Sequence, residues 1–195
     1  MESGAVDLPL DSEARYGFSA GLADPAAIRA TVGLADRLAF DSLWVGDHIA
    51  FAVPILDPLI QLAQAAAHSD RLTFGTAVFL LPLRHPTPVA KQVATLDLLC
   101  GGRLIFGVGV GGEFPREYEA CGVPVHERGA RLAEAIPLLR RLWSGEPVVS
   151  EGRFYPFPEV TMLPRPRQTS GPPIWCGGRN AKALERTGRI GDGKV

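Results

Sequence analysis

Short apolar runs alternate with helix-like segments along most of the chain. The runs predicted to be strands begin near Gly17, Leu43, Leu72, Arg103, Pro173 and Asp192. Their apolar residues are mostly consecutive, as in strands that are buried on both faces of a parallel sheet. The first four starts are 26, 29 and 31 residues apart, the length of a unit in which a helix returns the chain to a neighbouring parallel strand. The pattern therefore predicts an α/β fold.

Three predicted helices open on a polar residue followed by proline, at Asp24-Pro25, Asp57-Pro58 and Thr87-Pro88. Such a pair combines an N-cap side chain with a proline that the first helical turn tolerates. A later helix is expected from about Val125 to Trp143, because its apolar residues recur on one face.

The next predicted strand starts 70 residues after the fourth one. Within this gap, residues 147–157 read as a hairpin turning at Glu151-Gly152, followed by a proline-rich loop. The predicted organisation is a polar leader over residues 1–15 and one domain over residues 16–195, with an insertion at about 145–172.

Composition narrows the class of protein. The chain is 46% hydrophobic and 21% charged, with a net charge of −1, as in a globular protein. That charge argues against nucleic acid and against a membrane surface as partners. Three cysteines without metal-ligand spacing and no apolar run of about 18 residues predict a cytoplasmic protein with no metal site.

Charge is nevertheless uneven, because residues 163–195 hold seven basic and two acidic side chains. A solvated face and an anion-binding site both remain open for this segment. The run Trp175-Cys176-Gly177-Gly178-Arg179-Asn180 predicts a strand, a glycine turn and a helix. Backbone N–H groups and the positive end of a helix dipole would meet there, beside Arg179, which favours a phosphate over a plain turn.

Two other motifs match well-known patterns less completely. Gly17-Phe18-Ser19-Ala20-Gly21 fits the nucleophile elbow of α/β-hydrolases, but only sixteen residues precede it, too few for the strands that flank an elbow. Gly107 to Gly112 fits the dinucleotide-binding fingerprint, which requires a helix to open at the glycines. The next helix is expected more than ten residues later. What survives is a glycine-rich strand end that a flat group can approach closely.

His48 follows the second predicted strand in Gly46-Asp47-His48. The carboxyl ends of parallel strands are where such folds place their chemistry, so His48 is a candidate, although a structural histidine is the commoner finding. His68, His85 and His126 are given no chemical role.

Five ordered motifs together resemble the bacterial-luciferase-like monooxygenase family, and most closely its deazaflavin (coenzyme F420)-dependent oxidoreductases. These segments are residues 40–48, 75–78, 103–111, 127–129 with 142–145, and 177–178 with 191–193. The resemblance implies a (β/α)8 barrel in which the active site lies at the carboxyl ends of the strands.

The resemblance also implies roles for single residues. His48 would lie beside the reactive edge of the cofactor ring as proton donor, proton acceptor or charge stabiliser, and the preceding Asp47 is expected to be one of the cofactor-binding residues. A non-proline cis peptide is implied at Ala77-Val78, pressing a backbone bulge against that ring. The strand-end residues Gly109, Val110 and Gly111 would approach the ring, and Gly177, Gly178 and Arg179 would hold the cofactor's phosphate.

The function that follows is hydride transfer with F420, or monooxygenation with FMN, on a small organic substrate by a homodimer. Ala50-Phe51-Ala52 stands where some relatives carry tryptophan, which disfavours a sugar phosphate. The alternatives are a non-catalytic subunit of the same fold and a serine hydrolase using Ser19. A barrel of this type takes about 250 residues, so we expect an unclosed barrel that stops after about strand 6 and is a poor enzyme alone.

Overall fold

The computed structural model describes residues 15–21 and 24–195. The predicted leader, residues 1–15, therefore lies outside the described residues apart from Arg15. The elements in chain order are β1 (Gly17–Ser19), α1 (Pro25–Arg37), β2 (Ser42–Val45), α2 (Pro58–Ala66), β3 (Thr73–Thr76), η1 (Leu81–Leu83), α3 (Pro86–Leu99), β4 (Leu104–Val108), α4 (Pro115–Ala120), η2 (Val125–Glu127), α5 (Arg128–Trp143), β5 (Val148–Ser150), β6 (Phe157–Val160), β7 (Ile174–Cys176), α6 (Ala181–Ile190) and β8 (Gly193–Lys194).

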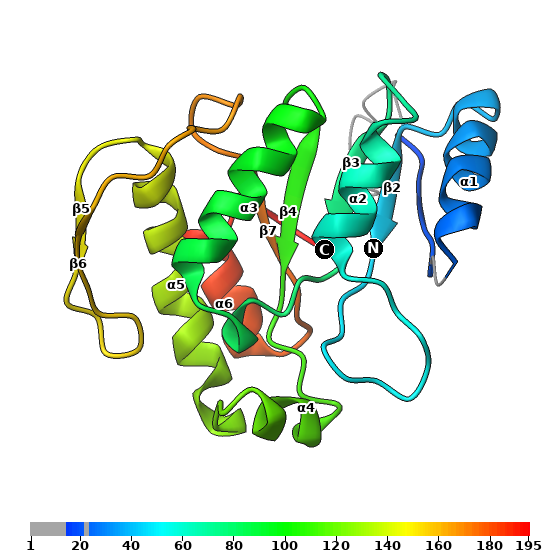
Figure 1. The fold of residues 1–195 in the computed structure, drawn as a ribbon. Coiled ribbons are helices and arrows are strands. Elements are labelled where there is room, and N and C mark those ends of the chain that lie inside the picture. The colour runs from blue at the N-terminus through cyan, green and yellow to red at the C-terminus, as the bar shows by residue number, and fades with distance from the viewer. Residues whose placement is uncertain (1–14, 22–23) are drawn as a thin grey trace, which may run out of the picture.

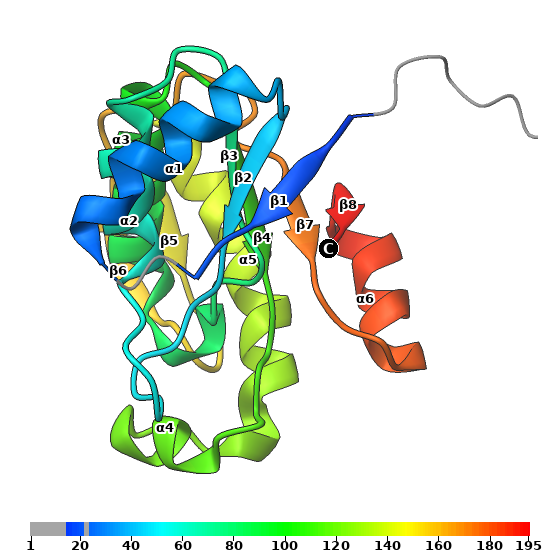
Figure 2. The ribbon, with the colours of Figure 1, turned by 90° about the vertical axis from the view of Figure 1, so that its right-hand side faces the viewer.

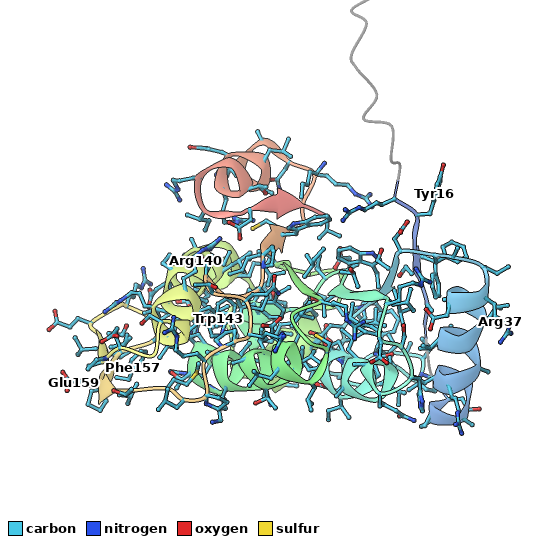
Figure 3. The ribbon with its side chains drawn as sticks, turned by 90° about the horizontal axis from the view of Figure 1, so that it is seen from above. Tyr16, Arg37, Arg140, Trp143, Phe157 and Glu159 are labelled. Carbon is cyan, nitrogen blue, oxygen red and sulfur yellow. The ribbon has the colours of Figure 1, made fainter. Side chains whose placement is uncertain are left out.

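Six parallel strands form one sheet in the order β1-β2-β3-β4-β7-β8. β1 and β8 are its two edges, and they do not pair with each other within the described residues. Seen from above, the sheet follows an arc with α1, α2, α3 and α5 along its outer side (Figure 3). The prediction of an unclosed parallel barrel is confirmed, and all six predicted strand positions hold strands.

The outer face of the sheet carries the main hydrophobic core. Leu43, Phe74 and Leu104 lie opposite one another on neighbouring strands and are fully buried or nearly so. Helices α1, α2, α3 and α5 cover this face, as Figure 2 shows from the side. Trp143 at the end of α5 is buried and donates its indole N–H to the carbonyl of Ala90 in α3, which ties two outer helices together.

The inner face is built from tryptophan and glycine. Trp44 lies opposite Gly75, and Trp175 lies opposite Gly193. A Cβ atom added at Gly75 would overlap the Trp44 ring, so the glycine is what lets that ring lie flat on the sheet. The two indoles stack with their centroids 5.4 Å apart.

The segment between β4 and β7 forms a separate antiparallel hairpin, β5 and β6, at the outside of α5 (Figure 1). β4 pairs directly with β7, so the hairpin leaves the order of the main sheet undisturbed. Glu134 of α5 accepts the backbone N–H groups of Phe154 and Tyr155, which fastens the turn of the hairpin to the helix.

Two helix starts differ from the sequence-based expectation. Asp24 and Asp57 do cap α1 and α2, but α3 begins at Pro86, where the His85 ring accepts the N–H of Thr87. The predicted cap at Thr87 is therefore wrong, because the proline one residue earlier already starts the helix. The helix expected no earlier than Val125 is preceded by α4, which begins at Pro115, only three residues after Gly112.

Candidate active site

The carboxyl ends of β2, β3, β4 and β7 lie at one edge of the sheet, which is the lower edge in Figure 1, next to α4. All the residues predicted to act on a cofactor come from the loops at this edge. The edge has a small apolar core of its own, separate from the main one, made by Leu80, Leu83, Tyr118 and Val123. This core fixes α4 against the loop that follows β3.

Asp47 is turned into the protein. Its side chain is fully buried and accepts the N–H of Leu80 at 2.8 Å. Both terminal nitrogens of Arg84 donate to it, at 2.5 and 2.9 Å. A carboxylate held by a forked guanidinium is a strong, directional pair. Asp47 thus joins the loop after β2 to the loop after β3, and within the described structure it supports the site rather than facing open space.

His48, the next residue, contacts an acid that sequence reasoning missed. Its Nδ1 lies 3.2 Å from Oε2 of Glu117, on α4. The Glu117 side chain is 2% exposed and the His48 side chain is 22% exposed. The other carboxylate oxygen, Oε1, accepts the backbone N–H groups of Ile49 and Ala50. One buried carboxylate therefore holds both the imidazole and the backbone that follows it.

Aromatic rings surround the imidazole. Phe51 stacks on His48 with centroids 3.9 Å apart and planes 15° apart. Phe114 meets Phe51 edge-on at 4.6 Å. Both phenylalanines are more than a third exposed. The mouth of the site at His48 is consequently apolar.

The Ala77-Val78 peptide is cis, in agreement with the family expectation. The Val78 side chain reaches across the ends of β4 and β7: a Cβ atom at Gly177 would lie 2.7 Å from Val78 Cγ1, and one at Gly109 would overlap the same side chain. Because neither position has a side chain, the bulge after β3 packs directly on the next two strand ends. The structure thus brings Val78, Gly109 and Gly177 together.

The glycine-rich end of β4 is fixed from α4. The Tyr118 hydroxyl donates to the carbonyl of Val110, and burial raises the pKa of Tyr118 to about 12. Gly111 packs against Leu80, and the Arg128 side chain lies on Gly112. Arg128, at the start of α5, therefore places a positive charge beside the glycine-rich end of β4.

The turn after β7 has the predicted shape. Gly178 has φ of +138°, a conformation that side chains other than glycine's rarely adopt. Arg179 is exposed, and Asn180 caps α6 by accepting the N–H of Ala183 at 2.9 Å. The helix start, with its positive dipole end, therefore lies next to the exposed Arg179 guanidinium at the carboxyl edge.

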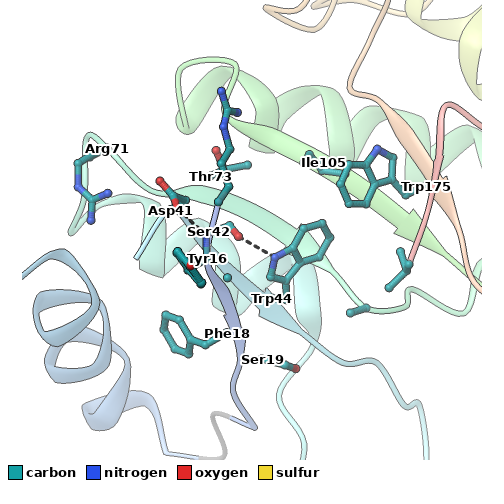
Figure 4. A pocket seen from close by; sticks show the side chains of 14 residues that line it. Tyr16, Phe18, Ser19, Asp41, Ser42, Trp44, Arg71, Thr73, Ile105 and Trp175 are labelled. Carbon is teal, nitrogen blue, oxygen red and sulfur yellow. Dashed lines mark hydrogen bonds between the residues drawn. The ribbon is translucent and has the colours of Figure 1, made fainter. Parts of the chain in front are cut away.

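A hollow lies on the inner face of the sheet (Figure 4). Its volume is about 1240 Å³, and Trp44, Ile105 and Trp175 form its apolar wall. Of the predicted cofactor residues only Ala77 lines it. The hollow therefore borders the cis bulge, while His48 and Arg179 lie outside its lining.

Glu117 and Arg84 are the residues missed by sequence reasoning. Glu117 lies 69 positions from His48, and along the chain it looks the same as Glu119, which is exposed. No spacing rule joins positions so far apart. Arg84 lies in a loop, and nothing in the sequence around it indicates that its side chain pairs with Asp47.

The alternative readings of the motifs lack structural support. In the described part of the chain, no histidine or carboxylate hydrogen-bonds to the Ser19 hydroxyl. α4 follows the β4 glycines, but it has six residues, and β7 ends at Cys176 and is followed by Gly177 rather than by an acid that would bind a ribose. Among residues 15–21 and 24–195, no group of three or more histidine, cysteine or acidic side chains could hold a metal. No helix there has both the length and the apolar character to cross a bilayer.

The fold and the site define a class: an open, parallel α/β half-barrel of the luciferase-like TIM type, with its polar and glycine-rich residues gathered at the carboxyl edge. Residues 5–195 match the model of the luciferase-like monooxygenase family, and the chain belongs to that family. It is 33% identical over 155 residues to the oxygenase component of a flavin-dependent trigonelline monooxygenase from Acinetobacter baylyi, covering 78% of this chain and 42% of the relative.

A second relative names the other cofactor of the family. The chain is 36% identical over 190 residues to an F420-dependent glucose-6-phosphate dehydrogenase from Beutenbergia cavernae, covering 92% of this chain and 55% of the relative. The crystal structure of monooxygenase RslO1 from Streptomyces bottropensis superimposes with a TM-score of 0.81 at 31% identity, covering 90% of this chain and 57% of that one. The chain spans about half the length of the curated relatives it matches.

Proposed function

We propose that this chain is the cofactor-binding and proton-handling part of an F420-dependent oxidoreductase that acts on a small organic substrate, with FMN as the alternative cofactor. The carrying observation is the pairing of His48 with a buried carboxylate at the same sheet edge as the cis Ala77-Val78 bulge. Because the relatives include both F420- and flavin-dependent proteins, preference for F420 rests on the relative that covers 92% of the chain.

The residues present fit a flat cofactor that bears a phosphate. The hollow reaches the cis bulge at Ala77, where a flat ring would enter it, while most of its lining comes from β1 and from the starts of β2 and β3. Its Trp44 and Trp175 walls offer aromatic surface. Arg179 and the start of α6 offer a charge and a helix dipole to a phosphate, which both F420 and FMN carry.

When bound, the cofactor supplies hydride transfer as a deazaflavin or oxygen activation as a flavin. The chain itself positions and handles protons. Nδ1 of His48 is occupied by Glu117, whereas Nε2 makes no hydrogen bond to any described residue. His48 would thus accept or donate a proton at Nε2, as a histidine does in general acid–base chemistry.

Fluorescence titration with F420 and with FMN tests the proposal. F420 should bind more tightly than FMN, and Arg179→Ala should weaken binding of the favoured cofactor about tenfold through loss of a charge-assisted contact to phosphate. Arg189→Ala, an exposed arginine at the far end of the same helix, is the matched control and should bind normally. Tight binding of neither cofactor would overturn the assignment.

Turnover tests the role of His48. With F420, a panel of small organic substrates and single-turnover conditions that detect a slow reaction of the open barrel, His48→Ala should slow the reaction at least about 100-fold, the usual contribution of a general acid or base, while cofactor affinity stays within about twofold. Equal turnover of His48→Ala and the parent chain would remove His48 from the reaction.

A further inference from the structure

Glu117 is the most deeply buried acid at the carboxyl edge that no ion pair to arginine or lysine explains. Its three hydrogen-bond partners come from one short segment, namely Nδ1 of His48 and the N–H groups of Ile49 and Ala50. They divide between its two oxygens: Oε2 faces the ring, and Oε1 accepts from the two backbone groups. Each oxygen therefore has a fixed task.

We propose that Glu117 is a positioning residue that decides which nitrogen of His48 carries the proton. An ionised carboxylate has no proton to give, so at Oε2 it can only accept. Nδ1 of His48 must then donate, and the neutral ring keeps its lone pair on Nε2. The catalytic meaning of this rests on the proposed function, whereas the position of the proton is a property of the chain alone.

The residues around His48 and Glu117 restrict both side chains, which keeps the direction of their hydrogen bond fixed. The Phe51 ring lies flat on the imidazole, and Phe114 approaches the imidazole edge-on with centroids 6.2 Å apart, so the ring has apolar neighbours on two sides. The other nearby acid, Asp47, is engaged by Arg84. α4 itself is anchored by the buried Tyr118, directly after Glu117. Glu117 is thus held where it acts on Nδ1.

Glu117→Gln should invert the arrangement without removing a side-chain atom. The N–H groups of Ile49 and Ala50 need an acceptor, so they retain the amide oxygen at the place of Oε1. The amide NH₂ then faces His48 and donates to Nδ1. The ring must accept there, and its proton moves to Nε2, the atom that should be free to handle the substrate's proton.

The experiment is ¹⁵N NMR of histidine-labelled protein at mildly alkaline pH, where free imidazole is neutral. In the parent chain, Nδ1 of His48 should resonate as a protonated nitrogen and Nε2 as a bare one. In Glu117→Gln the two signals should exchange character, and turnover with a bound cofactor should fall about 100-fold or more. Glu119→Gln, an exposed acid on the same helix, is the matched control and should leave both signals unchanged.

Two results would overturn the proposal. A proton on Nε2 in the parent chain contradicts it whether or not any variant folds. An unchanged tautomer in a folded Glu117→Gln chain shows that the carboxylate does not set it. Failure to bind F420 or FMN, by contrast, removes the proposed function and leaves the NMR result intact, so the two failures are distinguishable.

Discussion

After β2 the candidate site is held by buried charged side chains, whereas after β7 it is made of backbone. On the first side, Asp47 is clasped by Arg84, and Glu117 holds His48. On the second side, Gly177 and Gly178 have no side chains, and Arg179 is exposed. The β2 side is stabilised by contacts between charged side chains. The β7 side depends on the absence of side chains at its glycines, which lets other groups approach the backbone closely.

This difference has a chemical reason. A residue that handles a proton needs its orientation and tautomer fixed, and buried hydrogen-bonded groups do that. A phosphate is recognised by backbone N–H groups and a helix dipole, which need close approach rather than side chains. The two sides should therefore respond to opposite kinds of substitution: removal of side chains should damage the β2 side, and addition of side chains should damage the β7 side.

The largest expected effect is that of Asp47→Ala. It leaves the Arg84 guanidinium, whose side chain is only 17% exposed, without its close partner and removes the acceptor for the Leu80 N–H. Breaking a buried pair from one side costs about 3–5 kcal/mol, so the free energy of unfolding in urea should fall by that amount.

Asp57→Asn is the control for that change. Asp57 is 3.7 Å from the same Arg84, but its side chain is 42% exposed, and asparagine still caps α2. A loss below about 1 kcal/mol is expected, as for exposed ion pairs. Equal losses in the two variants would show that Asp47 is no more important to the β2 side than a surface charge.

Alkaline pH should weaken the same side through Tyr118. Burial raises its pKa to about 12 in the folded chain, against about 10 in an unfolded one. The stabilisation is fully present below pH 10 and is lost as the pH rises from 10 towards 12, because only the unfolded state then ionises freely. Two pKa units correspond to about 3 kcal/mol.

Tyr118→Phe isolates this effect, because the variant lacks the phenol. Every other group that ionises between pH 10 and 12 is present in both proteins. The variant should start about 1 kcal/mol less stable at neutral pH, because the Val110 carbonyl loses its partner. The parent chain should then lose stability more steeply between pH 10 and 12. Parallel curves for the two proteins would contradict a buried, un-ionised Tyr118.

The parallel strands and the hairpin could be predicted from the sequence because buried strands leave runs of consecutive apolar residues and regular spacings. The cis bond at Ala77 and the glycine turn at Gly177 were predicted through family resemblance and motif. Glu117 could not be found that way. Its role depends on α4 folding back under the loop after β2, and no local pattern distinguishes it from Glu119.

The β7 side should be sensitive to an added methyl group. In Gly177→Ala the new Cβ atom would lie 2.7 Å from Val78 Cγ1, and overpacking of this kind costs about 1–3 kcal/mol. Val78→Ala in the same chain should restore most of the loss, as a double-mutant cycle in urea would show. Gly188→Ala is the control: this helical glycine has no heavy atom near a built Cβ, so alanine should stabilise α6 by about 0.5–1 kcal/mol. Independent effects of Gly177→Ala and Val78→Ala would refute direct packing.

The smallest effect separates stability from binding on the β7 side. Asn180→Ala removes the N-cap that accepts the Ala183 N–H and should cost about 1 kcal/mol of unfolding free energy. Arg179→Ala, one residue earlier and exposed, should change stability by less than about 0.5 kcal/mol while weakening cofactor binding. Thermal unfolding and titration of both variants check this. If Arg179→Ala destabilised the chain as much as Asn180→Ala does, the arginine would be part of the helix start itself, and the β7 side would rely on side chains much as the β2 side does.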